Sequence, residues 1–140
     1  MSRVYFTDRD LGKRFPDILS AAGLAVESHH QLFEPAGPDV EWLEHCGAND
    51  RIALTHNERI RYTPNELIAV VRHRVRLLIV SGKAPFPQLA KNFVTTLPKI
   101  EAFLAVHEPP YIAKIYRPTD AELERNPDKS GSIVLWYPKR

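Results

Sequence analysis

The chain has 140 residues, enough to bury one hydrophobic core, and its 44% apolar and 26% charged residues are typical of a globular protein. No apolar run approaches the roughly 20 residues that cross a bilayer, so we expect no membrane association, and a net charge of +2 permits a nucleic-acid partner without requiring one. A single cysteine, Cys46, excludes an internal disulfide and favours a reducing, cytoplasmic location.

The chain begins with an apolar segment from Val4 to Phe6 that ends in Thr7-Asp8-Arg9-Asp10. In an α/β domain, a buried first strand delivers such carboxylates to the crevice at its carboxyl end. Two carboxylates about 4 Å apart repel by roughly 4 kcal/mol at an effective dielectric constant of about 20. Such a pair therefore requires a cation, an arginine or a raised pKa. The alternative is local, with Asp8 capping a turn and Asp10 capping the next helix.

Strand-like and helix-like segments alternate over the next hundred residues, as shown by their hydrophobic periodicity and by the proline and glycine residues at their ends. In the first half of the chain we predict a helix over 11–22 with a short turn before Pro16, a strand at 24–26, a loop at 27–35 and a helix from Pro38. A turn at 47–50, a strand at 51–55 and a helix that follows Thr63 come next. A strand at 75–80 and a helix at 87–104, which Pro98 kinks or divides, complete the alternation. This alternation predicts an α/β fold with a mainly parallel central sheet and helices on both faces.

Two helix starts carry acids. Asp39 and Glu41 lie in the first turn of the helix at Pro38, where the helix dipole also favours them. Thr63-Pro64-Asn65-Glu66 has the pattern of a capping box, in which the Glu66 side chain reaches back to the Thr63 backbone.

The C-terminal part differs, because residues 111–116 and 133–137 are rich in β-formers and are separated by a polar stretch. They pair either as a hairpin with a long loop or as an addition to the sheet edge. We find no repeat and no linker, and we predict one domain over residues 1–140, with a core at about 3–116 and a β-rich extension at about 117–140.

The carboxyl ends of parallel strands lie along one edge of a sheet, and oxygen-rich side chains from several segments are predicted to meet there. Magnesium and manganese prefer such ligands. The residues concerned are Asp8, Asp10, Asp39, Glu41, Thr55, His56, Asn57, Glu58 and Ser81.

The segment from Val4 to about Ile115 resembles the PIN-like domains of bacterial toxin–antitoxin systems, particularly the VapC45-like branch of VapC-type toxins. The similarity lies in residues 6–12, 38–43 and 52–60. It implies a three-layer PIN-like fold and a ribonuclease that depends on Mg²⁺ or Mn²⁺. It also implies an RNA substrate and a cognate antitoxin protein, and it is compatible with a homodimer.

The resemblance further implies a metal site in which Asp8 is the first acid and Asp39 the second, with Glu41 as its substitute and Asp10 as a further ligand. Relatives end the third strand in Thr-x-Asp, whereas this chain has Thr55-His56-Asn57. Asn57 offers a neutral carbonyl oxygen. Metal affinity is then reduced, or Glu58 compensates, or cleavage has been lost.

The implied reaction is hydrolysis of RNA by metal-activated water, which Thr55 and Asn57 help to orient. Five arginines are candidates for contacts with the RNA backbone, and such contacts weaken with added salt. They are Arg59, Arg61, Arg72, Arg74 and Arg76. Alternatively, these arginines are only water-exposed residues of a helix face and a loop. We interpret the neighbouring His73 as a surface residue.

Two other functions fit parts of the sequence. A degenerate PIN-like module would bind RNA or a partner protein without cleavage, and Asn57 favours it. A haloacid-dehalogenase-type phosphatase would use Asp8 as nucleophile and Asp10 as acid/base. The predicted fourth strand, however, leads to Ser81-Gly82-Lys83, which provides no acid for the magnesium of such an enzyme.

Overall fold

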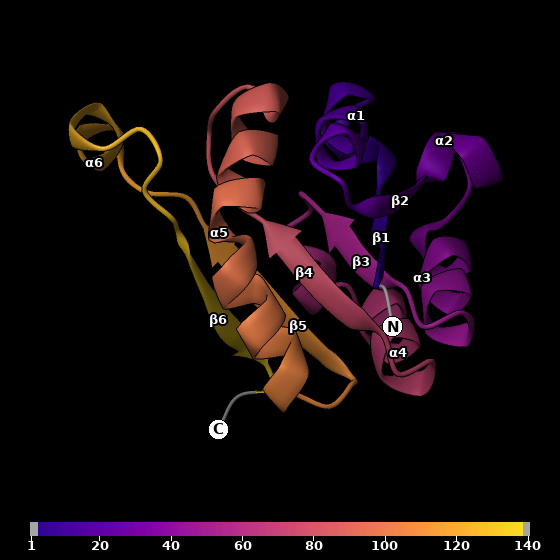
Figure 1. The fold of residues 1–140 in the computed structure, drawn as a ribbon. Coiled ribbons are helices and arrows are strands. Elements are labelled where there is room, and N and C mark those ends of the chain that lie inside the picture. Colours follow the sequence, from indigo (N-terminus) through magenta and orange to yellow (C-terminus); the bar gives the residue numbers. More distant parts are fainter. Residues whose placement is uncertain (1–2, 139–140) are drawn as a thin grey trace.

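A six-stranded sheet forms the centre of the computed structural model, which describes residues 3–138 (Figure 1). The strands lie in the order β2-β1-β3-β4-β5-β6, in which the first five are parallel and β6 runs antiparallel to β5. Their bounds are β1 Val4–Thr7, β2 Ala25–Ser28, β3 Ile52–Thr55, β4 Arg76–Val80, β5 Tyr111–Tyr116 and β6 Ser132–Tyr137. The predicted α/β fold with a mainly parallel sheet is confirmed.

Helices cover both faces of this sheet. The helices of the chain are α1 Arg14–Ala21, α2 His29–Leu32, α3 Asp39–Ala48, α4 Pro64–Arg72, α5 Phe86–Val106 and, away from the sheet, α6 Asp120–Arg125, with short 3₁₀ turns η1 Arg9–Leu11 and η2 Ile60–Tyr62. None of the helices within residues 3–138 has the length and apolar character needed to cross a membrane.

Two hydrophobic cores lie on opposite faces of the sheet, because successive side chains of a strand point to opposite sides. On one face, α1 and α5 pack on Tyr5, Leu54 and Leu78. On the other face, α3 and α4 pack on Phe6 and Ala53. Strands buried on both faces explain the continuous apolar runs in the sequence.

The C-terminal segment returns along the edge of the sheet. It leaves β5, forms α6 at a distance from the sheet, and returns as β6 beside β5 (Figure 1). The two predicted alternatives are therefore both present, since the strands form a long-looped hairpin that also adds to the sheet edge.

The structure decides one open alternative and corrects three local predictions. Pro98 lies inside a single helix, α5, and does not open a second one. The first long helix starts at Arg14, so Pro16 is its third residue and not its first. The segment predicted as a loop at 27–35 contains the end of β2 and the helix α2. Its signal is a capping box, in which the side chain of each of Ser28 and Gln31 bonds to the backbone of the other. The box predicted at Thr63 is absent.

Candidate active site

The strand order places a topological switch point between β1 and β3. The chain moves from β1 outward to β2 and then returns to the opposite side of β1 with β3. In open α/β sheets, ligands bind at the carboxyl edge beside such a reversal, because the crossing segments diverge there. Asp8 directly follows β1 and Thr55 ends β3, so these two residues lie at this point.

The hydroxyl of Thr55 connects two carboxylates. Its Oγ1 lies 2.9 Å from Oδ2 of Asp8 and 3.1 Å from Oδ2 of Asp10. A hydroxyl has one hydrogen, so it donates to one carboxylate at a time and the other contact requires a carboxyl proton. Asp10 is held a second time by the backbone N–H of His56, which lies 3.1 Å from both of its oxygens.

Both carboxyl groups are difficult to ionise in this position. The pKa of Asp8 is raised to about 7, mainly by burial and also by the charges of Asp10 and Asp39, while the hydrogen bonds from Thr55 and from the Arg9 N–H oppose this rise. Burial is also the main reason that the pKa of Asp10 is raised. Within residues 3–138, neither acid forms an ion pair with lysine, arginine or histidine.

Asp8 also has the local role that the sequence left open. Its Oδ1 accepts a hydrogen bond of 2.8 Å from the Arg9 N–H and caps η1. Asp10 does not cap a helix, because its oxygens are directed to Thr55 and to the backbone of His56. Only Asp8 therefore combines a capping role with a place in the acid pair.

A second acid pair involves Asp39 at the start of α3. The Oδ1 of Asp39 accepts a hydrogen bond of 3.0 Å from Nε1 of Trp42, a buried residue that stacks on Phe6 at 5.6 Å. The carboxyl group of Glu66 lies against Asp39. Burial, the charge of Asp39 and a hydrogen bond that protonated Glu66 shares with Asp39 raise the pKa of Glu66 to about 7.

Glu66 is the acid that sequence reasoning missed as a site residue. Its Oε1 is buried and has no hydrogen-bond partner within residues 3–138. The side chain was predicted to reach back to Thr63, but it turns to Asp39 on the neighbouring helix α3 instead. No local pattern in the sequence announces this contact, because it depends on how α3 and α4 pack together.

His29 was also missed. It follows β2 as Asp8 follows β1, and the register pairs Thr7 with Ser28, so the two residues leave adjacent strands side by side. The ring is 2% exposed, its Nδ1 has no hydrogen-bond partner within residues 3–138, and burial lowers its pKa. The strand-edge rule would have identified it if β2 had been predicted to extend to Ser28.

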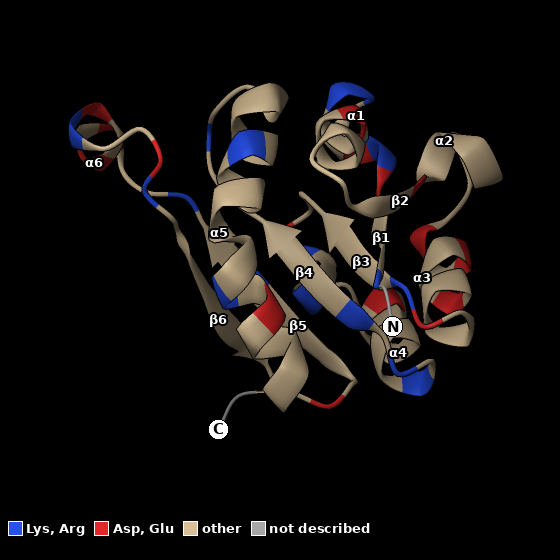
Figure 2. Ribbon diagram, viewed as in Figure 1, with Lys and Arg blue, Asp and Glu red and all other residues tan. Residues whose placement is uncertain are grey.

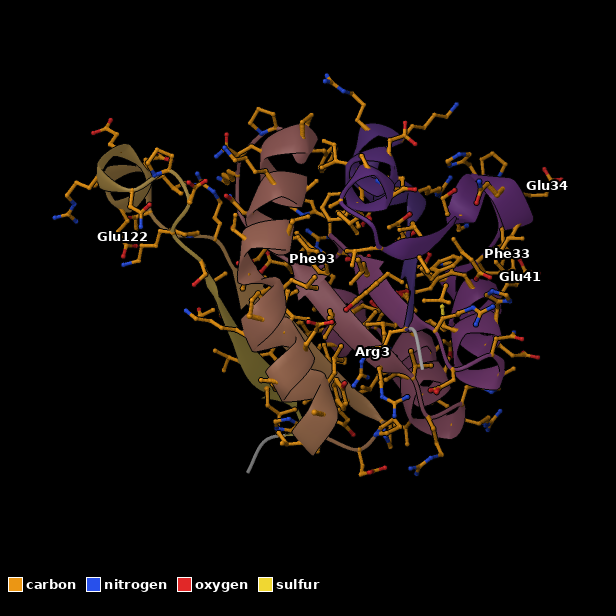
Figure 3. All side chains as sticks on the ribbon, viewed as in Figure 1. Arg3, Phe33, Glu34, Glu41, Phe93 and Glu122 are labelled. Carbon is orange, nitrogen blue, oxygen red and sulfur yellow. The ribbon has the colours of Figure 1, made fainter. Side chains whose placement is uncertain are left out.

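Two other predicted acids, Glu41 and Glu58, lie outside the two acid pairs. Glu41 is exposed and its Oε1 lies over Gly37, at the outer side of α3 near Phe33 (Figure 3). Glu58 is exposed and forms an ion pair with Lys114, so it does not replace the acid that Asn57 lacks.

Asn57 is half-buried and lies beside the Asp8–Asp10 pair. Its Oδ1 accepts from the Arg59 N–H at 3.0 Å, and its own N–H donates to Thr55 Oγ1 at 3.2 Å. The side chain thus closes a local turn, and the backbone N–H connects this turn to Thr55, the residue that bonds both acids.

The candidate RNA-binding arginines fall into two groups. Arg59 and Arg61 lie in the segment that leaves β3 at the carboxyl edge of the sheet. Arg72, Arg74 and Arg76 lie between the end of α4 and the start of β4, at the opposite edge, and Arg76 forms an ion pair with Asp50. Figure 2 accordingly shows basic segments at both ends of the sheet.

The residues at this edge fit a hydrated divalent cation. Within residues 3–138, no three histidine, cysteine or acidic side chains converge closely enough to hold a metal ion by themselves. Magnesium, however, keeps several water ligands and is held directly by only one or two carboxylates. The two acid pairs supply such carboxylates, and one of their oxygens, Oε1 of Glu66, has no hydrogen-bond partner within residues 3–138.

Without metal, the protein is expected to lose stability as the pH rises from 5 to 8. Asp8 has a pKa of about 7 when folded and 3.8 as the unperturbed value, so its protonation stabilises the fold at low pH. That contribution is lost progressively as the pH rises through the interval between these values. Melting temperatures measured in EDTA should therefore be lower at pH 8 than at pH 5, and Mn²⁺ should restore stability at pH 8. A melting temperature in EDTA that rises from pH 5 to pH 8 would contradict this expectation.

Comparison with known proteins gives a family but no individual relative. Residues 4–82 match a family model described as a PIN like domain. No curated protein and no solved structure matches the chain. The matched segment extends from the start of β1 to just beyond β4, so it contains both acid pairs, Asp8–Asp10 and Asp39–Glu66.

Proposed function

This chain belongs to the PIN-like domain family, and on that premise we propose that it is a metal-dependent ribonuclease. The observation that carries the proposal is the pairing of Asp8 with Asp10, and of Asp39 with Glu66, beside the switch point of the sheet. No cationic side chain of residues 3–138 forms an ion pair with these acids. Buried carboxylates without a cationic partner attract a divalent cation, because the cation removes both their repulsion and the cost of their burial.

Asp8 and Asp39 would hold Mg²⁺ or Mn²⁺ directly, while Asp10 and Glu66 would act through water ligands. When bound, such an ion lowers the pKa of a coordinated water and neutralises charge on the phosphate. Thr55 and the backbone of His56 keep Asp8 and Asp10 at the edge of the sheet.

Trp42 and His56 position the surrounding groups. Trp42 fixes the orientation of Asp39 through its indole N–H. The Nδ1 of His56 donates to the carbonyl oxygen of Val80 at 2.7 Å, and the ring packs edge-on against Phe86. Because a carbonyl oxygen only accepts, Nδ1 is the donor in this contact, which fixes the orientation of the ring.

The similarity to VapC-type toxins extends the proposal to a toxin–antitoxin pair. A cognate antitoxin that covers the carboxyl edge of the sheet would block access of RNA to Asp8 and Asp39. This partner, like a homodimer, stays a prediction.

The proposal is tested by incubating the purified protein with single-stranded RNA and Mg²⁺, Mn²⁺ or EDTA. Cleavage with either ion and none with EDTA supports it. Binding without cleavage under all conditions favours the degenerate module, for which Asn57 in place of an acid is the specific observation. Cleavage that persists in EDTA would contradict the metal requirement.

A further inference from the structure

A group of aromatic and basic side chains lies on the sheet beside the candidate active site. Its members come from η2, β5 and β6, which are far apart in the sequence. We call it the Trp136 patch, and it consists of Arg61, Tyr62, Lys114, Tyr116 and Trp136.

Cations and rings alternate within the patch. The guanidinium carbon of Arg61 lies 4.7 Å from the centre of the Trp136 ring and 5.3 Å from that of Tyr62. The Nζ of Lys114 lies 5.1 Å from the Trp136 ring and 5.2 Å from that of Tyr116. Trp136 therefore positions both cations, and Tyr62 and Tyr116 stand at the two ends.

The two terminal rings are open to solvent. Tyr62 is 68% exposed and Tyr116 is 42% exposed. Val134, which pairs with Lys114 across β5 and β6, is 49% exposed, so this part of the sheet is not buried under a helix. Exposed aromatic side chains that add nothing to the core are typical of binding surfaces.

The charge of the patch favours an anionic partner. Lys114 forms an ion pair with Glu58, whereas Arg61 forms no ion pair with any residue of the described part of the chain, 3–138. One positive charge is thus left over beside two exposed rings. Single-stranded nucleic acid matches this combination, because bases stack on aromatic rings and on guanidinium planes while phosphates pair with the cations.

The patch is connected to the candidate active site through the sheet. Thr55, which bridges Asp8 and Asp10, pairs with Ile79 on β4, and Ile79 pairs with Lys114 on β5. Lys114 of the patch therefore lies two strands from Thr55, at the same level of the sheet. We infer that the Trp136 patch is the platform that binds the single-stranded RNA substrate, with Tyr62 and Tyr116 stacking on bases and Arg61 contacting a phosphate. This inference rests on the proposed function for the identity of the strand as substrate.

The test measures binding separately from cleavage. The Asp8→Asn protein is titrated in EDTA into a fluorescein-labelled oligouridylate of about 12 nucleotides, and anisotropy reports the Kd. Adding Tyr62→Ser is expected to raise the Kd about tenfold, whereas adding Tyr62→Phe, which keeps the ring, should leave it within about twofold. Adding Arg61→Gln should reduce the slope of log K against log salt by about 0.7, because one phosphate contact is lost.

Several outcomes would overturn the inference. They are an unchanged Kd in Tyr62→Ser, equal binding of a duplex of the same length, and no RNA binding at all. A dimer of the protein that Tyr62→Ser converts to monomer in light scattering would assign the patch to a second copy instead. Tyr62 is largely exposed, so its replacement is expected to leave the melting temperature unchanged. RNA cleavage by the protein with native Asp8 tests the proposed function independently of the patch. Cleavage together with unchanged binding by the patch variants would overturn only the inference about the patch. Weakened binding by the patch variants without any cleavage would overturn only the proposed nuclease activity.

Discussion

Replacing Asp8 with asparagine is expected to abolish metal-dependent RNA cleavage. The amide retains the shape of the carboxylate and caps η1 equally well, because asparagine and aspartate are comparable N-cap residues. It lacks the negative charge that attracts a divalent ion. Loss of an outer-shell partner of a metal ligand costs roughly 10- to 100-fold in affinity or activity, so loss of a direct ligand should reduce kcat/KM at least about 100-fold. Single-turnover cleavage of labelled RNA in saturating Mn²⁺ provides the measurement.

The same substitution should stabilise the metal-free protein at pH 8. Asp8 is 4% exposed and has a pKa of about 7, so at pH 8 the native protein contains a buried charge close to Asp10. The neutral amide removes this charge, with a gain on the order of 2 to 4 kcal/mol in the free energy of unfolding. At pH 3, where the carboxyl group is protonated in both the folded and unfolded states, the gain should disappear. Urea unfolding in EDTA at the two pH values measures the difference.

Asp17→Asn is a matched control for both effects. Asp17 lies on α1, is exposed, and loses the same charge without belonging to either acid pair. It should alter neither cleavage nor the pH dependence of stability. If Asp8→Asn cleaves RNA at the native rate, Asp8 does not belong to the active site. If it lowers stability at pH 8, neither the burial of the Asp8 charge nor its repulsion by Asp10 destabilises the native protein.

The strands and their carboxyl edge were predictable because the physics that sets them is local. Strands buried on both faces are continuous apolar runs, and polar residues begin where burial ends. This is why Asp8 after β1 and Thr55 at the end of β3 could be expected at one edge, and the structure joins them by a hydrogen bond of 2.9 Å.

The second acid pair was less accessible from the sequence. Thr63 and Glu66 have the spacing of a capping box, and the local pattern gave no reason to look further. The contact between Glu66 and Asp39 depends on the packing of α4 against α3 over the buried Trp42. The Glu66 side chain could bond either to the Thr63 backbone, as the local pattern predicts, or to Asp39 on α3, and in the structure it lies against Asp39.

Ion pairs between distant segments also could not be predicted from the sequence. The sequence suggested that Glu58 replaces an acid at position 57, but Glu58 forms an ion pair with Lys114 on β5 and lies outside the acid pairs. The Trp136 patch is hidden for the same reason, because β6 reaches η2 only through its pairing with β5. Sequence reasoning identified Arg61 by its charge alone, and the structure adds the rings that surround it.

Asn57→Asp is expected to add an acid beside Asp8 and Asp10 and to tighten Mn²⁺ binding about tenfold, which corresponds to about 1.4 kcal/mol. The aspartate can still accept from the Arg59 N–H, and the backbone N–H of residue 57 can still donate to Thr55 Oγ1, so the turn is preserved. The substitution adds only a charge beside Asp8 and Asp10, and the affinity of hard cations rises with the number of charged ligands. Isothermal titration with Mn²⁺ at pH 8 measures the change.

The metal-free form of this variant should respond in the opposite direction. A third negative group raises the pKa of Asp8 further, because like charges disfavour ionisation, so stability in EDTA at pH 8 should fall while stability in Mn²⁺ rises. Glu58→Gln is the matched control: it changes a charge at the next residue, but that charge is paired with Lys114, and Mn²⁺ affinity should not change. Unchanged Mn²⁺ affinity in Asn57→Asp would place residue 57 outside the metal site. A tenfold gain in affinity together with faster RNA cleavage would show that asparagine at position 57 weakens the native site without inactivating it.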